Sequence, residues 1–299
     1  PASVNPAFKK TDLGSGRISF TEAIFRNTDL NFSRAETQEA LMDFEKTQLS
    51  SIDLSYCFFN RYLNFRFECA EQIDLTNAVV RDILDMHVPK SGKPAPVIFF
   101  TDMSLPGLLY INWEKNKIEQ AIYNQGDKTT HYEKSTQFLM LKENFSRNGQ
   151  YEDEDLAYVE YRRCIAHARR YDGQKKFWSK ISDTTVYLLD RLLLDYTGLY
   201  GTSPLRVFLT MISFYILFSL GYLLIIYTGA GDIVVSVGEA YNLSFWSKGF
   251  YHSAITMLTI GYGDHFPTGL ARGVSAIQGF VGMLLLSYFT VSLVHKILR

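Results

Sequence analysis

The sequence predicts a membrane protein in two parts: a C-terminal module of two membrane-spanning helices, preceded by a β-rich repeat domain and a helical linker. Three observations carry this prediction. Two long apolar runs cover residues 205–227 and 273–293, a five-residue periodicity runs through residues 16–80, and helical periodicity follows residue 128. The polar N-terminal portion dilutes the membrane signal, because 47% of the 299 residues are hydrophobic, as in an ordinary soluble protein.

The five-residue periodicity fits neither an α-helix nor a flat strand. It resembles that of pentapeptide-repeat proteins. The resemblance implies that residues 1–94 form a square, right-handed β-helix whose stacked coils bury one continuous core. An ordinary β-rich domain is the alternative. The residues expected to fill the interior are Phe20, Phe25, Leu30, Leu49, Leu54, Phe59, Phe65, Ala70, Leu75 and Val80, with Ile18, Ala23, Ile52, Cys57, Ile73 and Ala78 two places earlier.

The middle of the chain changes from strands to helices. Apolar runs at residues 97–100 and 108–113 predict strands, and we assign residues 95–128 to a β/loop cap. Residues 129–200 predict a helical hairpin broken at Asn148 and Gly149, then a third helix over residues 183–196. That helix either lies at the inner membrane surface or packs beneath the two-span module.

An acidic run at residues 152–155 opens the second helix of this hairpin. Consecutive carboxylates on a helix point in different directions, and no loop with calcium-ligand spacing accompanies them. Acidic residues in a first helical turn also interact favourably with the helix dipole. We therefore favour this structural interpretation of the run over a calcium-sensing site.

The two apolar runs predict the membrane spans of a module over residues 201–299. The first has Arg206 as its only charge and reaches about 35 Å, enough to cross a hydrocarbon core of about 30 Å. Ser203 and Pro204 predict its start, with a capping hydroxyl before a proline at the first helical position. The alternative is that either run is a buried core helix of a soluble domain. Two membrane spans explain the pair of runs better.

Basic residues lie before the start of the first run and after the end of the second run. The segment between the runs, residues 228–247, holds no Lys or Arg. The positive-inside rule therefore predicts that both termini are cytoplasmic, in a protein of the cell membrane. The residues that carry this prediction are Lys175, Lys176, Lys180, Arg191, Arg206, His295, Lys296 and Arg299, with Lys248 and Arg272 as exceptions.

Between the spans, Ser244 can cap a short helix that continues to Thr256, and a glycine-rich segment follows it. A backbone that aims successive carbonyls one way needs residues that tolerate positive φ. The segment consists of Thr259, Ile260, Gly261, Tyr262, Gly263 and Asp264. These residues closely resemble the selectivity filter of potassium channels.

This resemblance implies a potassium-selective channel in which four identical subunits surround one pore. The carbonyls of Thr259, Ile260, Gly261 and Tyr262 would coordinate potassium, and the Thr259 hydroxyl would complete the inner site. Tyr262 would point away and wedge the segment against its surroundings. The helix ending at Thr256 looks like a pore helix whose carboxyl end favours a cation in the cavity.

Asp264 is expected to concentrate cations at the outer mouth. In relatives, a tryptophan and a glutamate of the pore helix hold this aspartate region, and the matching positions here are Tyr251 and Ile255. Tyr251 remains a donor for Asp264, and we assign Tyr251 and Thr256 to pore-helix support. Ile255 cannot replace a carboxylate.

In two-span potassium channels a glycine of the inner helix acts as a hinge, and Gly282 is the closer match. A packing role is equally consistent for Gly282 and is favoured for Gly279. Helical spacing from Gly282 predicts a cavity-lining face, at whose cytoplasmic end an apolar residue could close the pore by dewetting. The face comprises Leu286, Thr290, Val294 and Leu298.

The leading hypothesis is a potassium channel regulated by its N-terminal domain. Two alternatives remain: a membrane-anchored cytoplasmic scaffold or sensor, and a weakly selective cation channel. No enzymatic motif is apparent, because the histidines are scattered singly and the three cysteines are widely spaced, as suits a reducing cytosol. We expect membrane lipid and copies of the chain as partners, no nucleic acid, and no cofactor besides potassium ions. The sequence names no regulatory ligand.

Overall fold

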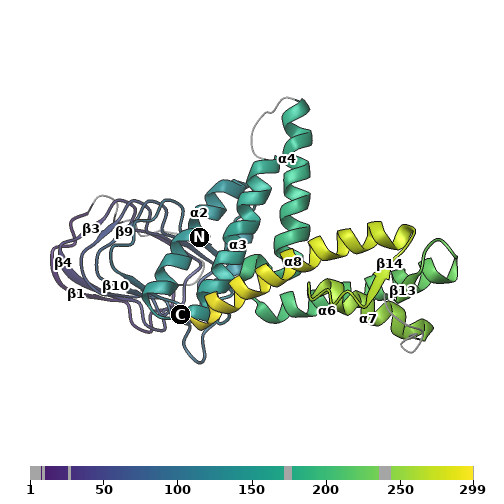
Figure 1. The fold of residues 1–299 in the computed structure, drawn as a ribbon. Coiled ribbons are helices and arrows are strands. Elements are labelled where there is room, and N and C mark those ends of the chain that lie inside the picture. The colour runs from purple at the N-terminus through teal and green to yellow at the C-terminus, as the bar shows by residue number, and fades with distance from the viewer. Residues whose placement is uncertain (1–7, 9–10, 26–27, 172–176, 236–243, 299) are drawn as a thin grey trace. The chain divides into compact units, whose positions relative to one another are not determined.

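The computed structural model describes residue 8 and residues 11–25, 28–171, 177–235 and 244–298 (Figure 1). The chain divides into two compact units, Pro1–Tyr187 and Leu188–Arg299. Each unit is described by itself.

The first unit begins with a parallel β-solenoid. Its strands form three parallel sheets, in the orders β1-β4-β7-β10-β12, β11-β8-β5-β2 and β3-β6-β9. Ile52 pairs with Leu30 in the preceding coil and with Ile73 in the following one. The strands are β1 (Ser15–Ser19), β2 (Asp29–Asn31), β3 (Glu36–Thr37), β4 (Glu39–Asp43), β5 (Ser51–Asp53), β6 (Phe58–Phe59), β7 (Leu63–Asn64), β8 (Gln72–Asp74), β9 (Val79–Val80), β10 (Ile83–Asp85), β11 (Val97–Phe99) and β12 (Leu108–Tyr110).

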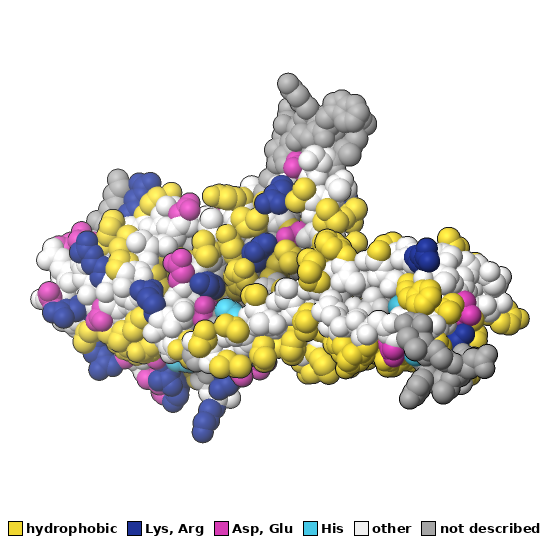
Figure 2. All heavy atoms as spheres, viewed as in Figure 1, with side chains coloured by type: hydrophobic (Ala, Val, Ile, Leu, Met, Phe, Trp, Pro, Cys, Tyr) yellow, Lys and Arg dark blue, Asp and Glu magenta, His cyan; other side chains and the backbone are white. Residues whose placement is uncertain are grey.

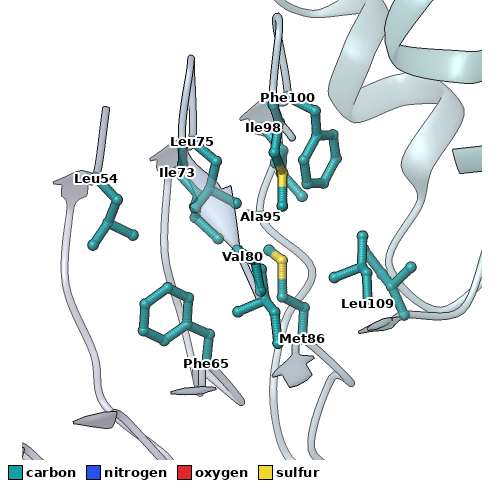
Figure 3. Packing of buried hydrophobic residues seen from close by; sticks show 14 of the residues in the cluster. Leu54, Phe65, Ile73, Leu75, Val80, Met86, Ala95, Ile98, Phe100 and Leu109 are labelled. Atoms are coloured by element: carbon teal, nitrogen blue, oxygen red, sulfur yellow. The ribbon is translucent and has the colours of Figure 1, made fainter. Parts of the chain in front are cut away.

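The five-residue pattern fills the solenoid interior, as the sequence predicted. The later members of both sets, such as Leu54, Cys57 and Val80, are fully buried in one continuous cluster (Figure 3). The members in the first coil, among them Phe20 and Phe25, are only partly buried and pack against the same cluster. A repeat gains its core from the coil stacked on it, so the first coil is the least covered.

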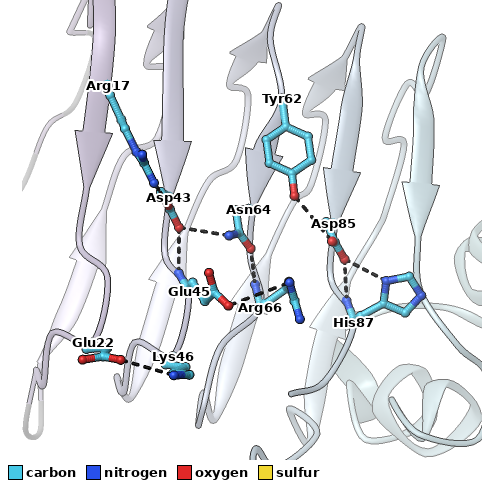
Figure 4. A network of polar contacts seen from close by, with 10 residues as sticks. All are labelled: Arg17, Glu22, Asp43, Glu45, Lys46, Tyr62, Asn64, Arg66, Asp85 and His87. Carbon is cyan, nitrogen blue, oxygen red and sulfur yellow. Dashed lines mark hydrogen bonds and ion pairs between the residues drawn. The ribbon is translucent and has the colours of Figure 1, made fainter. Parts of the chain in front are cut away.

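Carboxylate and amide side chains stabilise the turns between strands (Figure 4). Asp43, Asn64 and Asp85 each accept a hydrogen bond from the backbone N–H two residues later, at 3.0 to 3.3 Å. Short polar side chains commonly bond their own backbone in this way at turns. Asn64 also donates to Asp43 in the neighbouring coil at 3.0 Å. The turns of adjacent coils are thereby linked side chain to side chain.

Helices close the last coil of the solenoid. They are α1 (Ile118–Tyr123), η1 (Gly126–Lys128), α2 (His131–Arg147) and α3 (Tyr151–Tyr171). A capping box between Thr130 and Glu133 starts α2, and α2 and α3 form the predicted hairpin, with Gly149 in a left-handed conformation at the break.

Amide side chains of α2 pair with backbone groups that no further strand can reach. Asn144 accepts from Leu109 N–H at 2.9 Å and donates to Leu109 C=O at 2.8 Å, and Gln137 accepts from Phe100 N–H at 3.0 Å. The strands predicted near residues 97 and 108 are present as β11 and β12, each the outermost strand of a sheet. Side chains of α2 therefore provide the hydrogen bonds that a further coil would otherwise make to these strands.

Three of the four residues of the acidic run, Glu152, Asp153 and Glu154, lie in the first turn of α3, as the helix dipole favours. Asp153 accepts from Trp113 N–H at 3.2 Å, and Glu154 is buried 3.7 Å from Lys142. Among the described residues, no group of three or more His, Cys, Asp or Glu side chains could hold a metal ion. These two carboxylates have structural partners.

Helix α4 (Phe177–Asp190) continues into the second unit, where the third helix predicted over residues 183–196 becomes irregular. The elements that follow are the π-helical turn η2 (Arg191–Asp195), α5 (Tyr196–Gly198), η3 (Leu199–Gly201), α6 (Pro204–Tyr227), β13 (Ile233–Val235), α7 (Phe245–Met257), β14 (His265–Pro267) and α8 (Leu270–Ile297).

Helices α6 and α8 include both predicted spans and are somewhat longer. Pro204 stands at the start of α6, but the predicted cap is wrong, because the Ser203 side chain makes no capping hydrogen bond. Ser203 adopts φ −123° and ψ 89°, so its hydroxyl does not bond the first turn. Ser244 does cap α7, accepting from Ser247 N–H at 3.4 Å.

The sequence did not predict that β13 pairs with β14 in antiparallel fashion. This pairing joins the segment before α7 to the segment after the glycine-rich loop. Asp232 lies just before β13 and forms an ion pair at 3.1 Å with Lys248, one of the two basic exceptions to the charge rule. The strand pairing therefore anchors the segment after the loop, and the ion pair joins the start of β13 to the first turn of α7.

Candidate functional site

The site is built on the C-terminal end of α7. Thr259 N–H donates to Thr256 C=O at 3.1 Å, and Ile260 N–H donates to Ile255 C=O at 2.9 Å. With Thr259 at positive φ, these two bonds form a Schellman-type cap that ends α7. Beyond this cap, residues 260–264 form no helix or strand. The glycine-rich segment is therefore anchored at its start and has no regular secondary structure after it.

Alternate residues of this segment have positive φ: Thr259 at 54°, Gly261 at 57° and Gly263 at 77°. Alternation of this kind lets successive carbonyls face the same side, which a regular strand does not do. The two glycines adopt this conformation at no steric cost, as their positions in the sequence suggested. For Thr259 it costs about 1–2 kcal/mol, because its Cβ crowds the backbone. Only a structure could identify that third position.

Side chains of the segment are exposed in one chain. Tyr262 is 69% exposed and Ile260 is 46% exposed. The expectation that Tyr262 wedges the segment against its surroundings is therefore not met within the subunit. The Thr259 hydroxyl donates to Leu258 C=O at 2.7 Å, so its oxygen lone pairs remain as acceptors.

Asp264 ends the segment and is held by two donors. The Tyr251 hydroxyl donates to Asp264 Oδ2 at 2.6 Å, which is the hydrogen bond that the sequence suggested, and His265 N–H donates to Oδ1 at 3.0 Å. The hydrogen bond from Tyr251, followed by the nearby His265, lowers the pKa of the Asp264 carboxyl below its ordinary value. Asp264 is thus ionised at neutral pH.

Sequence reasoning treated His265 as an isolated histidine, but it belongs to the site. Its side chain is buried, with Nδ1 at 3.0 Å from Asp264 Oδ2 and its ring edge-on to Tyr251 at 5.3 Å. Ile255 is buried behind the segment and contributes its carbonyl instead of a side-chain acceptor. An imidazole therefore lies beside Asp264.

A buried polar cluster joins α6, α7 and α8. Gln278 donates to Ser253 Oγ at 2.7 Å and to Ser253 C=O at 3.0 Å, and it accepts from the Tyr222 hydroxyl at 2.7 Å. All three residues are fully buried. A buried amide with these partners fixes the relative position of three helices, because each group loses its partner if one helix moves. The single amide in an apolar run was the available signal.

Thr256, assigned to pore-helix support, accepts from Thr259 N–H through its carbonyl, while its hydroxyl lies 3.5 Å from His252 Nε2. His252 Nε2 also lies 3.1 Å from the Ser275 hydroxyl of α8. The polar contacts of α7 therefore continue to the residue that starts the glycine-rich segment.

The two glycines of α8 differ in their surroundings. A Cβ built on Gly282 would lie 2.3 Å from Met257 C=O, whereas one on Gly279 would meet only a methyl of Thr256 at 3.9 Å. Close packing thus requires glycine at Gly282, next to the end of α7. Within one subunit the packing role favoured for Gly279 has no comparable contact.

Three of the predicted cavity-lining residues lie on α8 away from its buried face, and the fourth, Leu298, is the C-cap of the helix. Leu286, Val294 and Leu298 are exposed, and the Thr290 hydroxyl bonds only its own helix, to Leu286 C=O at 3.0 Å. The buried face carries Gln278, Gly282, Leu285 and Ser292 instead. The predicted face is therefore available for contacts outside the subunit.

The described part of the chain contains two helices long and apolar enough to cross a membrane, α6 with 24 residues and α8 with 28. Apolar side chains gather on the surface of this unit (Figure 2), among them Leu217, Leu224 and Val291, each more than 60% exposed. Exposed apolar surface of this extent fits a lipid environment. Two such helices around a short helix and an anchored loop define a two-span membrane module.

Comparison with known proteins identifies this module. Residues 210–299 match the model of a family described as ion channel. The C-terminal part of the chain is an ion channel domain, and the N-terminal part is a β-solenoid consistent with pentapeptide repeats. No curated protein and no solved structure matches the chain.

Proposed function

We propose that this protein is a potassium-selective channel of the cell membrane, formed by four identical subunits. The observation that carries the proposal is the alternation of positive φ at Thr259, Gly261 and Gly263 in an exposed segment anchored to α7. Potassium loses its water to the carbonyls of Thr259, Ile260, Gly261 and Tyr262, with the Thr259 hydroxyl at the inner end.

Exposure supports the four-fold assembly. One glycine-rich loop cannot surround an ion, and a ring of copies closes the coordination shell. Ile260 and Tyr262 are exposed in one chain, and neighbouring subunits would cover them. Asp264, kept ionised by Tyr251, raises the cation concentration at the outer mouth.

The basic residues near the span ends support an orientation with both termini in the cytoplasm. The solenoid then lies in the cytoplasm and regulates the pore, to which it is joined through α4 and residues 191–201. Deletion of residues 1–182 is expected to change the open probability. Unchanged gating in a well-assembled deletion variant would contradict regulation but not conduction.

Reversal potentials test selectivity. The full chain in planar bilayers, with potassium on one side and sodium on the other, should reverse far from zero. Gly261→Ala should reduce that shift, because alanine at φ 57° costs about 1–2 kcal/mol and disturbs the carbonyls. Gly229→Ala is the matched control, because Gly229 also has positive φ, at 71°, has open surroundings and lies outside the segment.

Equal permeability of wild type to both cations would defeat the proposal and indicate a weakly selective channel. Absence of any current would favour a membrane-anchored scaffold.

A further inference from the structure

The segment that leads into the first span is fastened to the inner helix α8. The Tyr288 hydroxyl of α8 donates to Leu194 C=O at 3.2 Å, and the Ser292 hydroxyl donates to Gly201 C=O at 2.8 Å. Residues 191–201 are thus bonded at both ends to one helix about 90 residues later in the sequence. We call these two hydrogen bonds the latch.

Packing reinforces the latch. A Cβ built on Gly198 would lie 2.8 Å from the Tyr288 ring and 2.6 Å from Val207 of α6. Only a glycine lets the segment approach both helices this closely. Ser292 is fully buried, so water cannot readily replace its bond to Gly201.

The latched segment has an unusual backbone. It starts with the π-helical turn η2, and three consecutive residues, Leu199, Tyr200 and Gly201, have positive φ of 48°, 55° and 87°. Left-handed conformations are unfavourable for Leu and Tyr, because the Cβ atom crowds the following carbonyl oxygen. Such a conformation persists only where surrounding contacts hold it, and the latch supplies contacts of that kind.

The latch acts on one half of α8. Gln278 bonds the extracellular half to α7, and Gly282 packs against the end of α7. Tyr288 and Ser292 lie about 9 and 15 Å beyond Gly282 along the helix axis, toward the end of α8 where the gate residues were predicted. The inner helix is therefore held by α7 above Gly282 and by residues 191–201 below it.

We infer that Tyr288 and Ser292 are positioning residues that couple residues 191–201 to the gate half of the inner helix, so that this latch sets the equilibrium between open and closed channels. The inference rests on the proposed function, since it assigns residues to its gating. A change of tilt in the lower half of α8 must break the latch or carry residues 191–201 with it. Whatever moves that segment therefore acts on the gate.

Single-channel recording of the full chain tests the inference with Tyr288→Phe and Ser292→Ala, which remove one hydroxyl each. A hydrogen bond typically contributes a factor of about 2 to 10 to an equilibrium. Both variants should shift the open–closed equilibrium by about that factor, in the same direction, without changing the potassium to sodium permeability ratio. Ser287→Ala is the matched control, because this hydroxyl bonds only Met283 C=O of its own helix. No shift in the latch variants, or an equal shift in the control, would overturn the inference.

Hydrogen exchange provides a readout that does not depend on current. In the reconstituted full chain, Tyr288→Phe and Ser292→Ala should speed exchange of peptides covering residues 191–203, and Ser287→Ala should not. If wild type passes no potassium current, the proposed function fails. In that case, faster exchange in the two latch variants would show that the latch exists but has no gating role, which refutes the inference. Unchanged exchange in those variants would refute the latch itself.

Discussion

Replacing each glycine of the inner helix with alanine separates close packing from hinge bending. At Gly282 the added Cβ lies 2.3 Å from Met257 O and 3.0 Å from Met257 C, both backbone atoms that no rotamer change can move away. Ordinary van der Waals contact needs 3.4 Å or more, so α8 and the end of α7 must separate by about 1 Å. Overpacking of this kind costs about 1–3 kcal/mol.

Helix propensity acts in the opposite direction. Alanine stabilises a helix interior by about 1 kcal/mol relative to glycine. Gly279→Ala should gain this amount, because its Cβ meets only Thr256 Cγ2 at 3.9 Å. Gly282→Ala should lose up to about 2 kcal/mol after the same gain is subtracted. The two variants should therefore lie on opposite sides of wild type.

The assay is the apparent melting temperature of the assembled channel in one detergent at one scan rate, since unfolding of such assemblies is commonly irreversible. Recordings on the same variants complete the test. A hinge without close packing predicts that Gly282→Ala is as stable as Gly279→Ala and only opens less often. Equal stability of the two variants would refute the packing argument.

Three further predictions follow from buried or charged groups. Asn144→Leu should destabilise the N-terminal unit by about 1–3 kcal/mol in urea unfolding, because it leaves the buried N–H of Leu109 unpaired while Leu109 C=O keeps the hydrogen bond from Asn148 at 2.9 Å; the exposed change Glu143→Gln should have little effect. Tyr251→Phe should raise the pKa of Asp264 toward its ordinary value, so that potassium current falls at a higher external pH than in wild type; an unchanged pH profile would show that Asp264 does not support conduction. Burial raises the pKa of Cys57 to about 12 and that of Cys164 to about 11, so maleimide at pH 7.5 should leave both thiols intact in the folded protein, and rapid labelling of either would contradict the described core.

Periodic features of the chain could be predicted from sequence because each repeat meets the same environment. Leu54 and Val80 follow a five-residue rule that the solenoid interior imposes on every coil, and burial confirms it. The short helix before the glycine-rich segment was predicted from its capping serine, and it ends at Met257, one residue beyond the predicted Thr256. Local signals of this kind depend on neighbours in the sequence.

The remaining features depend on distances between distant segments. Gly279 and Gly282 look alike in sequence, and only the position of Met257 distinguishes them. The pairing of β13 with β14 joins segments about 30 residues apart, although the β-branched run Ile233–Val235 was a usable signal. The bonds from Tyr288 and Ser292 go to backbone carbonyls, which carry no sequence signature.

An experimental structure of the channel reconstituted in potassium, repeated with thallium as a heavy substitute, tests the central claim most directly. The account predicts ion density on a four-fold axis, surrounded by carbonyls of Thr259, Ile260, Gly261 and Tyr262 from four subunits. Ion density elsewhere, or an assembly in which these carbonyls face away from the axis, would contradict it.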